Sequence, residues 1–130
     1  MPTQKPNTHL KINADLCGRV VEITDKGSKV TLTVTPNMAV DAKGLIHGGF
    51  VFGLADYAAM VAVNHPNVVL GAANVKFLKP VKVGDTLVAT ATKKEVTGKK
   101  QIILVEVMYE ATSVFSGDFT CFVLEKHVLD

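Results

Sequence analysis

The chain has 130 residues, of which 48% are hydrophobic and 20% are charged, and its formal net charge at pH 7 is +2. This length fits one domain with a real hydrophobic core, so we expect residues 1–130 to form a single unit. The mild positive charge, scattered lysines and few aromatic residues exclude the basic surface that is typical of nucleic-acid-binding proteins.

The first predicted elements are two strands, at residues 19–24 and 29–34. Both segments are rich in Val, Ile and Thr, which favour extended backbone. Between them, residues 25–28 read Asp-Lys-Gly-Ser, a sequence that favours a tight turn. The pattern therefore predicts a hairpin, which ends at Pro36-Asn37 and is followed by a loop at residues 41–44.

The next predicted element is a helix at residues 50–63. It is apolar on every side and contains four alanines, so we expect other structure to enclose it. Proline cannot continue a helix, and the sequence Asn-His-Pro-Asn at residues 64–67 therefore supplies the stop signal.

The apolar run that contains this helix, residues 45–63, is interrupted by His47, two glycines and Asp56. Such interruptions indicate a buried helix and not a membrane span. Residues 1–12 also lack the continuous hydrophobic core of a secretory signal. We therefore expect a cytoplasmic protein without a membrane partner.

Four further strands are predicted at residues 69–77, 86–96, 101–111 and 118–124, the last after a turn at Ser116-Gly117. The order is then two strands, one long buried helix and four strands with short connections. This order indicates an α+β fold in which a largely antiparallel sheet wraps around one helix.

The two cysteines, Cys17 and Cys121, are far apart and show no spacing typical of metal ligands. We expect both to be reduced, buried thiols. No metal site is predicted.

His47-Gly48-Gly49 lies where the loop becomes the predicted helix. The first amides of a helix have no partner inside the helix, and the positive end of the helix dipole favours a negative oxygen there. Glycines also let another molecule approach the backbone closely. These features suit an oxyanion hole, which stabilises the negative charge that develops on a carbonyl under attack.

Asp56 is the only Asp, Glu, Lys or Arg between Lys43 and Lys76. Burial without a partner would be costly for its carboxylate and would raise its pKa, so we expect it to face a polar cavity or a partner. In that position it can act as a general base on water or attack an acyl carbon directly.

The spacing between the two groups makes a structural demand. Asp56 is seven residues beyond Gly49, a distance of about 10 Å along a helix. A reacting carbonyl must lie about 3 Å from both its nucleophile and its oxyanion donor. If both groups are catalytic, a two-fold dimer with antiparallel central helices can pair the glycine end of one chain with Asp56 of the other.

Two motifs in the chain together suggest a family. One is G-x-x-H-G-G at residues 44–49, followed by Asp56, and the other is NVKFLKPVKVGD at residues 74–85. With the predicted order of elements, they resemble the hotdog-fold acyl-CoA thioesterases of the phenylacetyl-CoA and 4-hydroxybenzoyl-CoA type. The resemblance covers about residues 18–125.

The resemblance implies a hotdog fold, with an antiparallel sheet wrapped around one long central helix. It also implies a homodimer that often pairs again into a homotetramer. The implied activity is hydrolysis of the thioester of a small or medium acyl-CoA, aromatic or aliphatic. No metal or separate cofactor is implied, because coenzyme A is part of the substrate.

The resemblance also assigns roles by position. Gly48 is the first choice for the amide that polarises the carbonyl, Asp56 is the nucleophile or the general base, and His47 shapes the site or contacts the thioester end. Three further residues are expected to bind the substrate: Gly49, Asp41 and Asn74. Four residues of the helix are candidates for lining the acyl pocket: Phe50, Phe52, Tyr57 and Met60.

Two positions depart from the family pattern. Many relatives have asparagine where this chain has Asp41, and a carboxylate cannot donate the amide hydrogen bond. Relatives also often hold the water with a hydroxyl near the start of the next strand, where residues 68–71 here read Val-Val-Leu-Gly. These departures motivate a second hypothesis, a non-catalytic hotdog protein that binds or senses acyl-CoA.

Overall fold

The computed structural model describes residues 3–130, and its elements follow the predicted order. In chain order they are α1 (Ala14–Cys17), β1 (Arg19–Thr24), β2 (Gly27–Thr33), the 3-10 helix η1 (Pro36–Met38), α2 (Gly48–Val63), β3 (Val68–Phe77), β4 (Thr86–Thr97), β5 (Lys100–Tyr109) and β6 (Thr112–Val123). Within the described residues the strands form one sheet in the order β1-β2-β4-β5-β6-β3, and every neighbouring pair is antiparallel. The predicted α+β architecture is confirmed.

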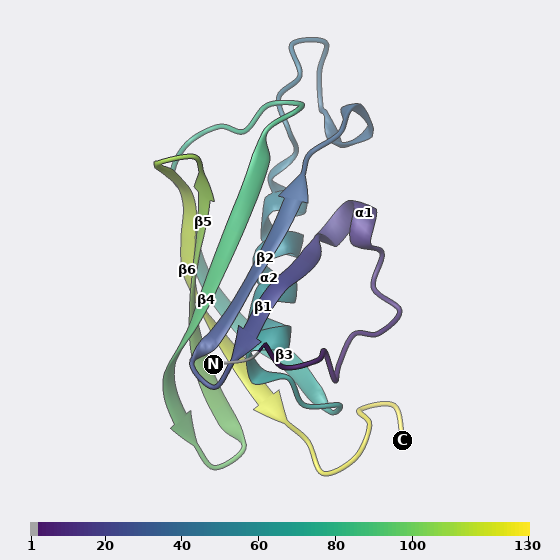
Figure 1. Ribbon diagram of the computed structural model, residues 1–130, viewed down its shortest axis with the longest axis vertical. Helices are drawn as coiled ribbons and strands as arrows, with labels where there is room; N and C mark the ends of the chain where they lie inside the picture. The colour runs from purple at the N-terminus through teal and green to yellow at the C-terminus, as the bar shows by residue number, and fades with distance from the viewer. Residues whose placement is uncertain (1–2) are drawn as a thin grey trace.

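The long helix α2 lies along one face of the twisted sheet (Figure 1). Ala55, Ala58 and Ala59 are fully buried, because small side chains let the helix approach the strands closely. A direct polar contact joins the two layers, since the Ser28 hydroxyl in β2 donates a 2.7 Å hydrogen bond to the Ala58 carbonyl oxygen in α2. The sheet and helix thus share one core, as the apolar pattern on all sides of the helix predicted.

The helix ends where the sequence predicted, but it begins two residues earlier. Asn64 caps the C-terminus in the left-handed conformation, with φ of 56° and ψ of 40°, and its amide donates to the Met60 carbonyl oxygen. The first helical residue is Gly48. Both glycines of the His-Gly-Gly motif therefore lie in the first turn of α2.

The prediction of a turn at Ser116-Gly117 is wrong. Both residues lie inside β6, and the chain turns earlier, at Glu110, whose φ is 52°. A β-carbon on Gly117 would lie 2.6 Å from Val75 Cγ1 and 2.7 Å from the Asn74 carbonyl oxygen of β3. This glycine therefore permits the close approach of two paired strands and does not mark a turn.

The N-terminal segment is held against the end of α2 by the side chain of Asn64. The Asn7 amide donates to Asn64 Oδ1 at 2.7 Å, and Asn64 Nδ2 donates to the Lys5 carbonyl oxygen at 2.9 Å. Earlier in the segment, the backbone amide of Gln4 donates to the Ile23 carbonyl oxygen of β1 at 2.8 Å. These bonds tie residues 4–7 both to the helix and to the edge of the sheet.

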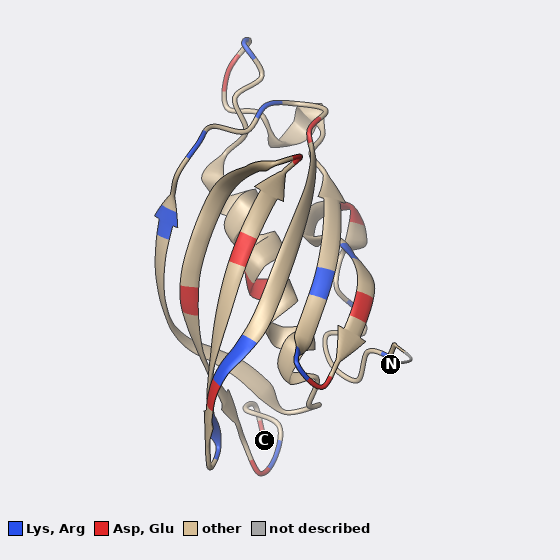
Figure 2. Cartoon of the chain, turned by 60° about the vertical axis from the view of Figure 1, so that its left-hand side comes forward, with Lys and Arg blue, Asp and Glu red and all other residues tan. Residues whose placement is uncertain are grey.

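Charged residues lie mainly in the strands of the sheet and in the loops (Figure 2). In α2 only Asp56 is charged, and the rest of the helix is uncoloured in this view. Among residues 3–130 no helix combines the length and the hydropathy that a membrane crossing requires.

Candidate active site

The start of α2 presents backbone amides without a side-chain cap. His47 is the N-cap residue, with φ of −63° and ψ of 129°, and within the described chain its side chain makes no capping hydrogen bond. The amide of Phe50 donates to the His47 carbonyl oxygen at 3.1 Å. The amides of Gly48 and Gly49 precede it, at the positive end of the helix dipole. This is the donor arrangement that an oxyanion hole requires.

Two aromatic rings lie directly against the two glycines. A β-carbon on Gly48 would stand 3.0 Å from Phe77 Cε2, and one on Gly49 would stand 3.0 Å from both Cδ2 and Nε2 of His47. The His47 ring also meets the ring of Phe50 edge-on, with centroids 6.1 Å apart. A β-carbon at either position would therefore require the neighbouring ring to move by a few tenths of an ångström.

Asp56 lies two turns further along α2 with an unsatisfied carboxylate. Its side chain is partly buried, and its Oδ1 atom is buried without a hydrogen-bond partner among residues 3–130. Burial raises the pKa of this carboxyl to about 6. An orphaned carboxylate oxygen of this kind can accept a proton from water or form a bond to an acyl carbon.

The charge of Asp56 acts on thiols from two other elements. Burial, and then the Asp56 carboxylate, raise the pKa of Cys17 in α1 and raise that of Cys121 in β6 to about 12. Within residues 3–130 both cysteines are free, and Cys121 is buried while Cys17 is only partly buried. Both thiols are therefore kept protonated beside the carboxylate.

Asp41 has a local role in the loop before the helix. Its Oδ1 accepts hydrogen bonds from the amides of Lys43 at 2.9 Å and Leu45 at 3.2 Å. These bonds shape the loop that leads to Ile46, which pairs with Ala39. An asparagine can accept the same two bonds through its own Oδ1, so the loop does not require a carboxylate at this position.

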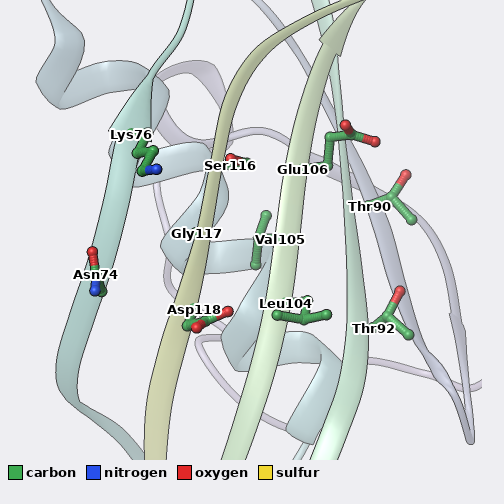
Figure 3. Close-up of a pocket in the computed structure, with 10 residues that line it drawn as sticks. All are labelled: Asn74, Lys76, Thr90, Thr92, Leu104, Val105, Glu106, Ser116, Gly117 and Asp118. Atoms are coloured by element: carbon green, nitrogen blue, oxygen red, sulfur yellow. The ribbon is translucent and has the colours of Figure 1, made fainter.

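Asn74 lies apart from the other predicted site residues. It is exposed on β3 and lines a groove of about 570 Å³ on the outer face of the sheet, together with Lys76 and Asp118. Figure 3 shows these side chains in front of the strands, with the helix behind. Within one chain the sheet separates Asn74 from α2, and its role in substrate binding stays a prediction.

A cavity that the sequence did not reveal adjoins Gly48. It has a volume of about 340 Å³, and its lining includes Val51, Phe77, Leu78 and Val114. None of the four aromatic or Met residues proposed from the sequence lines it, and Tyr57 and Met60 are buried in the core. Within residues 3–130 no cluster of three or more His, Cys, Asp or Glu side chains is arranged to hold a metal ion.

The sequence around the helix and most of the sheet matches a known family. The model of the thioesterase superfamily matches residues 43–115. The chain belongs to the thioesterase superfamily. Its sheet wrapped around α2 is the hotdog fold that the resemblance implied.

Two relatives with different named functions show how broad the similarity is. The chain is 34% identical over 121 residues to the acyl-coenzyme A thioesterase PaaI of Escherichia coli, a match that covers 85% of this chain and 86% of that protein. It is 28% identical over 120 residues to the transcription factor FapR of Caldanaerobacter subterraneus subsp. tengcongensis, covering 91% and 60%.

Two further similarities are stronger in sequence. The chain is 51% identical over 119 residues to a methylthioribose-1-phosphate isomerase of Aquifex aeolicus, covering 91% of this chain but 26% of that protein. The crystal structure of the uncharacterized protein PH1136 from Pyrococcus horikoshii matches all of both chains, with a TM-score of 0.98 and 53% identity. The chain thus spans only about a quarter of the length of the Aquifex relative and 60% of the length of the Caldanaerobacter relative.

Proposed function

We propose that this chain is a thioesterase that hydrolyses a small or medium acyl-CoA. The observation that carries the proposal is the buried Oδ1 atom of Asp56, which lacks a hydrogen-bond partner among residues 3–130. A structural carboxylate is ordinarily satisfied by its own chain, so an orphaned one is suited to a reacting group. The similarity to E. coli PaaI supports the same activity.

In the proposed reaction the Gly48 amide donates to the thioester oxygen and stabilises the negative charge on it. As a general base, Asp56 takes a proton from water while the water oxygen attacks the carbonyl carbon. As a nucleophile, an Asp56 oxygen attacks the carbon itself and forms an anhydride that water then hydrolyses. On either route the carbon–sulfur bond breaks, and coenzyme A leaves as a thiolate that takes up a proton.

We infer that two chains build each site. The strand β3 forms one edge of the sheet, and its residues 71–74 are exposed. An unpaired edge strand offers amides and carbonyls to a second strand. Antiparallel pairing of two β3 edges about a two-fold axis also places the two α2 helices antiparallel, which brings Gly48 of one chain toward Asp56 of the other.

The second candidate function is acyl-CoA binding without hydrolysis. It is favoured by the start of β3, where residues 68–71 have no hydroxyl side chain that could hold a water molecule. The similarity to FapR, a transcription factor, supports a binding function of this kind. The two functions share the acyl-CoA ligand and differ in turnover.

The deciding experiment is an assay of acyl-CoA esters with a reagent for free thiols. We expect hydrolysis by the wild-type protein and a loss of at least about 100-fold in kcat for Asp56→Asn. The matched control is Asp25→Asn, which makes the same change in the exposed turn between β1 and β2 and should leave the rate unchanged. Tight binding of acyl-CoA without turnover would establish the second function, and full activity of Asp56→Asn would exclude the proposed mechanism.

A further inference from the structure

The cavity beside Gly48 has an apolar floor and a partly exposed rim. Its floor is formed by Ile46, Val51 and Val114, each exposed by 5% or less. Its rim includes Phe77 and Leu78, which are exposed by 56% and 45%. In a single chain, solvent can therefore reach the mouth of the cavity, while its inner surface lies within the hydrophobic core.

The rim is held in place by bonds to β6. The amides of Leu78 and Lys79 both donate to the Val114 carbonyl oxygen, at 2.8 and 3.3 Å. The Phe77 ring meets the fully buried ring of Phe115 edge-on, with centroids 5.1 Å apart. These contacts fix the backbone that carries Phe77 and Leu78, so both side chains have a defined position relative to Gly48.

The position and lining of the cavity indicate what it can hold. Gly48 and Val51 are three residues apart and share one face of the first turn of α2, so the cavity begins at the proposed oxyanion donor. Among the described residues that line it, Lys79 alone has a polar side chain. The amides of a pantetheine arm would lose hydrogen bonds to water there, whereas a hydrocarbon chain would not.

We propose that this cavity binds the acyl chain of the substrate and that Leu78, at its rim, sets the accepted chain length. This inference rests on the proposed function, because it places the acyl chain beside the carbonyl that Gly48 polarises. The substrate class is then an uncharged apolar acyl group. Phe77, which touches Gly48 and the cavity, forms the wall nearest the thioester.

The volume of the cavity sets the expected size of the acyl group. A carbon-sized group needs about 30 Å³, the share of one water molecule in the liquid, so the 340 Å³ cavity holds at most about eleven such groups. Octanoyl and phenylacetyl groups both fit within this limit.

The test compares chain lengths in a narrowed cavity. Leu78→Trp fills the mouth, and its matched control is Leu10→Trp, which makes the same change at an exposed leucine of the N-terminal segment. We expect Leu78→Trp to lower kcat/KM for octanoyl-CoA at least tenfold and to leave butyryl-CoA within twofold of wild type. Leu10→Trp should change neither, and Leu78→Ala should move the optimum toward dodecanoyl-CoA.

Calorimetric binding to the Asp56→Asn background separates this proposal from the proposed function. Affinity that peaks at a medium chain length and shifts with Leu78→Trp supports the cavity even if the wild-type protein shows no turnover. Three results would overturn it. The first is equal weakening of all chain lengths and of free coenzyme A, which would place the pantetheine arm there; the others are affinity that does not depend on Leu78 and failure of every acyl-CoA to bind.

Discussion

The ring of Phe77 lies against the backbone of Gly48, where a β-carbon would stand only 3.0 Å from Phe77 Cε2. Gly48 is the first residue of α2, and Phe77 is the last residue of β3, the element that follows α2 in the chain. Their contact places an aromatic wall beside an amide that the described chain does not cap with a side chain.

Gly48→Pro should remove the proposed oxyanion donor without breaking the helix. Proline is tolerated at the first helical position, and the extended backbone of His47, with ψ of 129°, suits the residue before a proline. We expect a loss of about 100- to 1,000-fold in kcat, the usual effect of removing one such donor. The measurement is steady-state hydrolysis of octanoyl-CoA.

The matched control for this change is Gly48→Ala, which adds a β-carbon against the half-exposed ring of Phe77 but keeps the amide. A turn of the ring can relieve this contact, so its loss should be less than about tenfold. Equal losses in the two variants would show that crowding, and not the missing amide, explains the effect.

Mixing two inactive variants should restore activity if each site takes Gly48 from one chain and Asp56 from the other. A heterodimer of Gly48→Pro and Asp56→Asn then has one site with both defects and one intact site. Random pairing of equal amounts should give roughly a quarter of the wild-type activity, and the purified heterodimer roughly half. Co-expression with two affinity tags, followed by assay of the purified heterodimer, provides the measurement. Sites built within one chain would give no recovery.

The pH dependence of hydrolysis should follow the ionisation of Asp56. Only the carboxylate can act as a base or nucleophile, and burial raises its pKa to about 6. We expect kcat/KM to fall about tenfold per pH unit below that value. An acid limb centred near the ordinary carboxyl value of 3.8 would contradict the role of a buried Asp56.

The same burial predicts a cost in stability above pH 6. Because the folded chain binds this proton more tightly than the unfolded chain, the contribution of Asp56 to stability falls as pH rises from about 4 to about 6. Asp56→Asn removes this titration. It should therefore raise the free energy of unfolding at pH 8 by about 2 kcal/mol, allowing for the partial exposure of the side chain, and by much less at pH 4. Urea unfolding at the two pH values measures the difference.

Asn64 should stabilise the fold in two separable ways. Alanine adopts the left-handed backbone conformation of residue 64 less readily than asparagine does, and Asn64→Ala also removes both hydrogen bonds to the N-terminal segment. We expect it to lower the free energy of unfolding by about 2 kcal/mol. Asn64→Gly keeps the backbone conformation and loses only the bonds, so about half that cost is expected. Similar unfolding midpoints for the two variants would show that the hydrogen bonds account for the whole effect.

The order of the elements and the place of α2 could be predicted from the sequence because both follow from local patterns. A long apolar segment with alanines and a proline stop specifies a buried helix, and alternating Val and Thr segments specify strands. Gly117 shows the limit of this reasoning. Glycine is common both in turns and where backbones approach closely, and only the pairing of β6 with β3 distinguishes the two.

The sequence by itself determined the candidate reactive groups, since an isolated carboxylate and a glycine pair at a helix start are visible in the residue order. Only the tertiary structure decided what surrounds them. It brought Phe77 and Leu78 of β3 and its following loop beside Gly48, and it placed Asn74 on the opposite face of the sheet. Contacts between segments that are far apart in the chain depend on strand pairing and on packing across the core, and local sequence patterns do not record them.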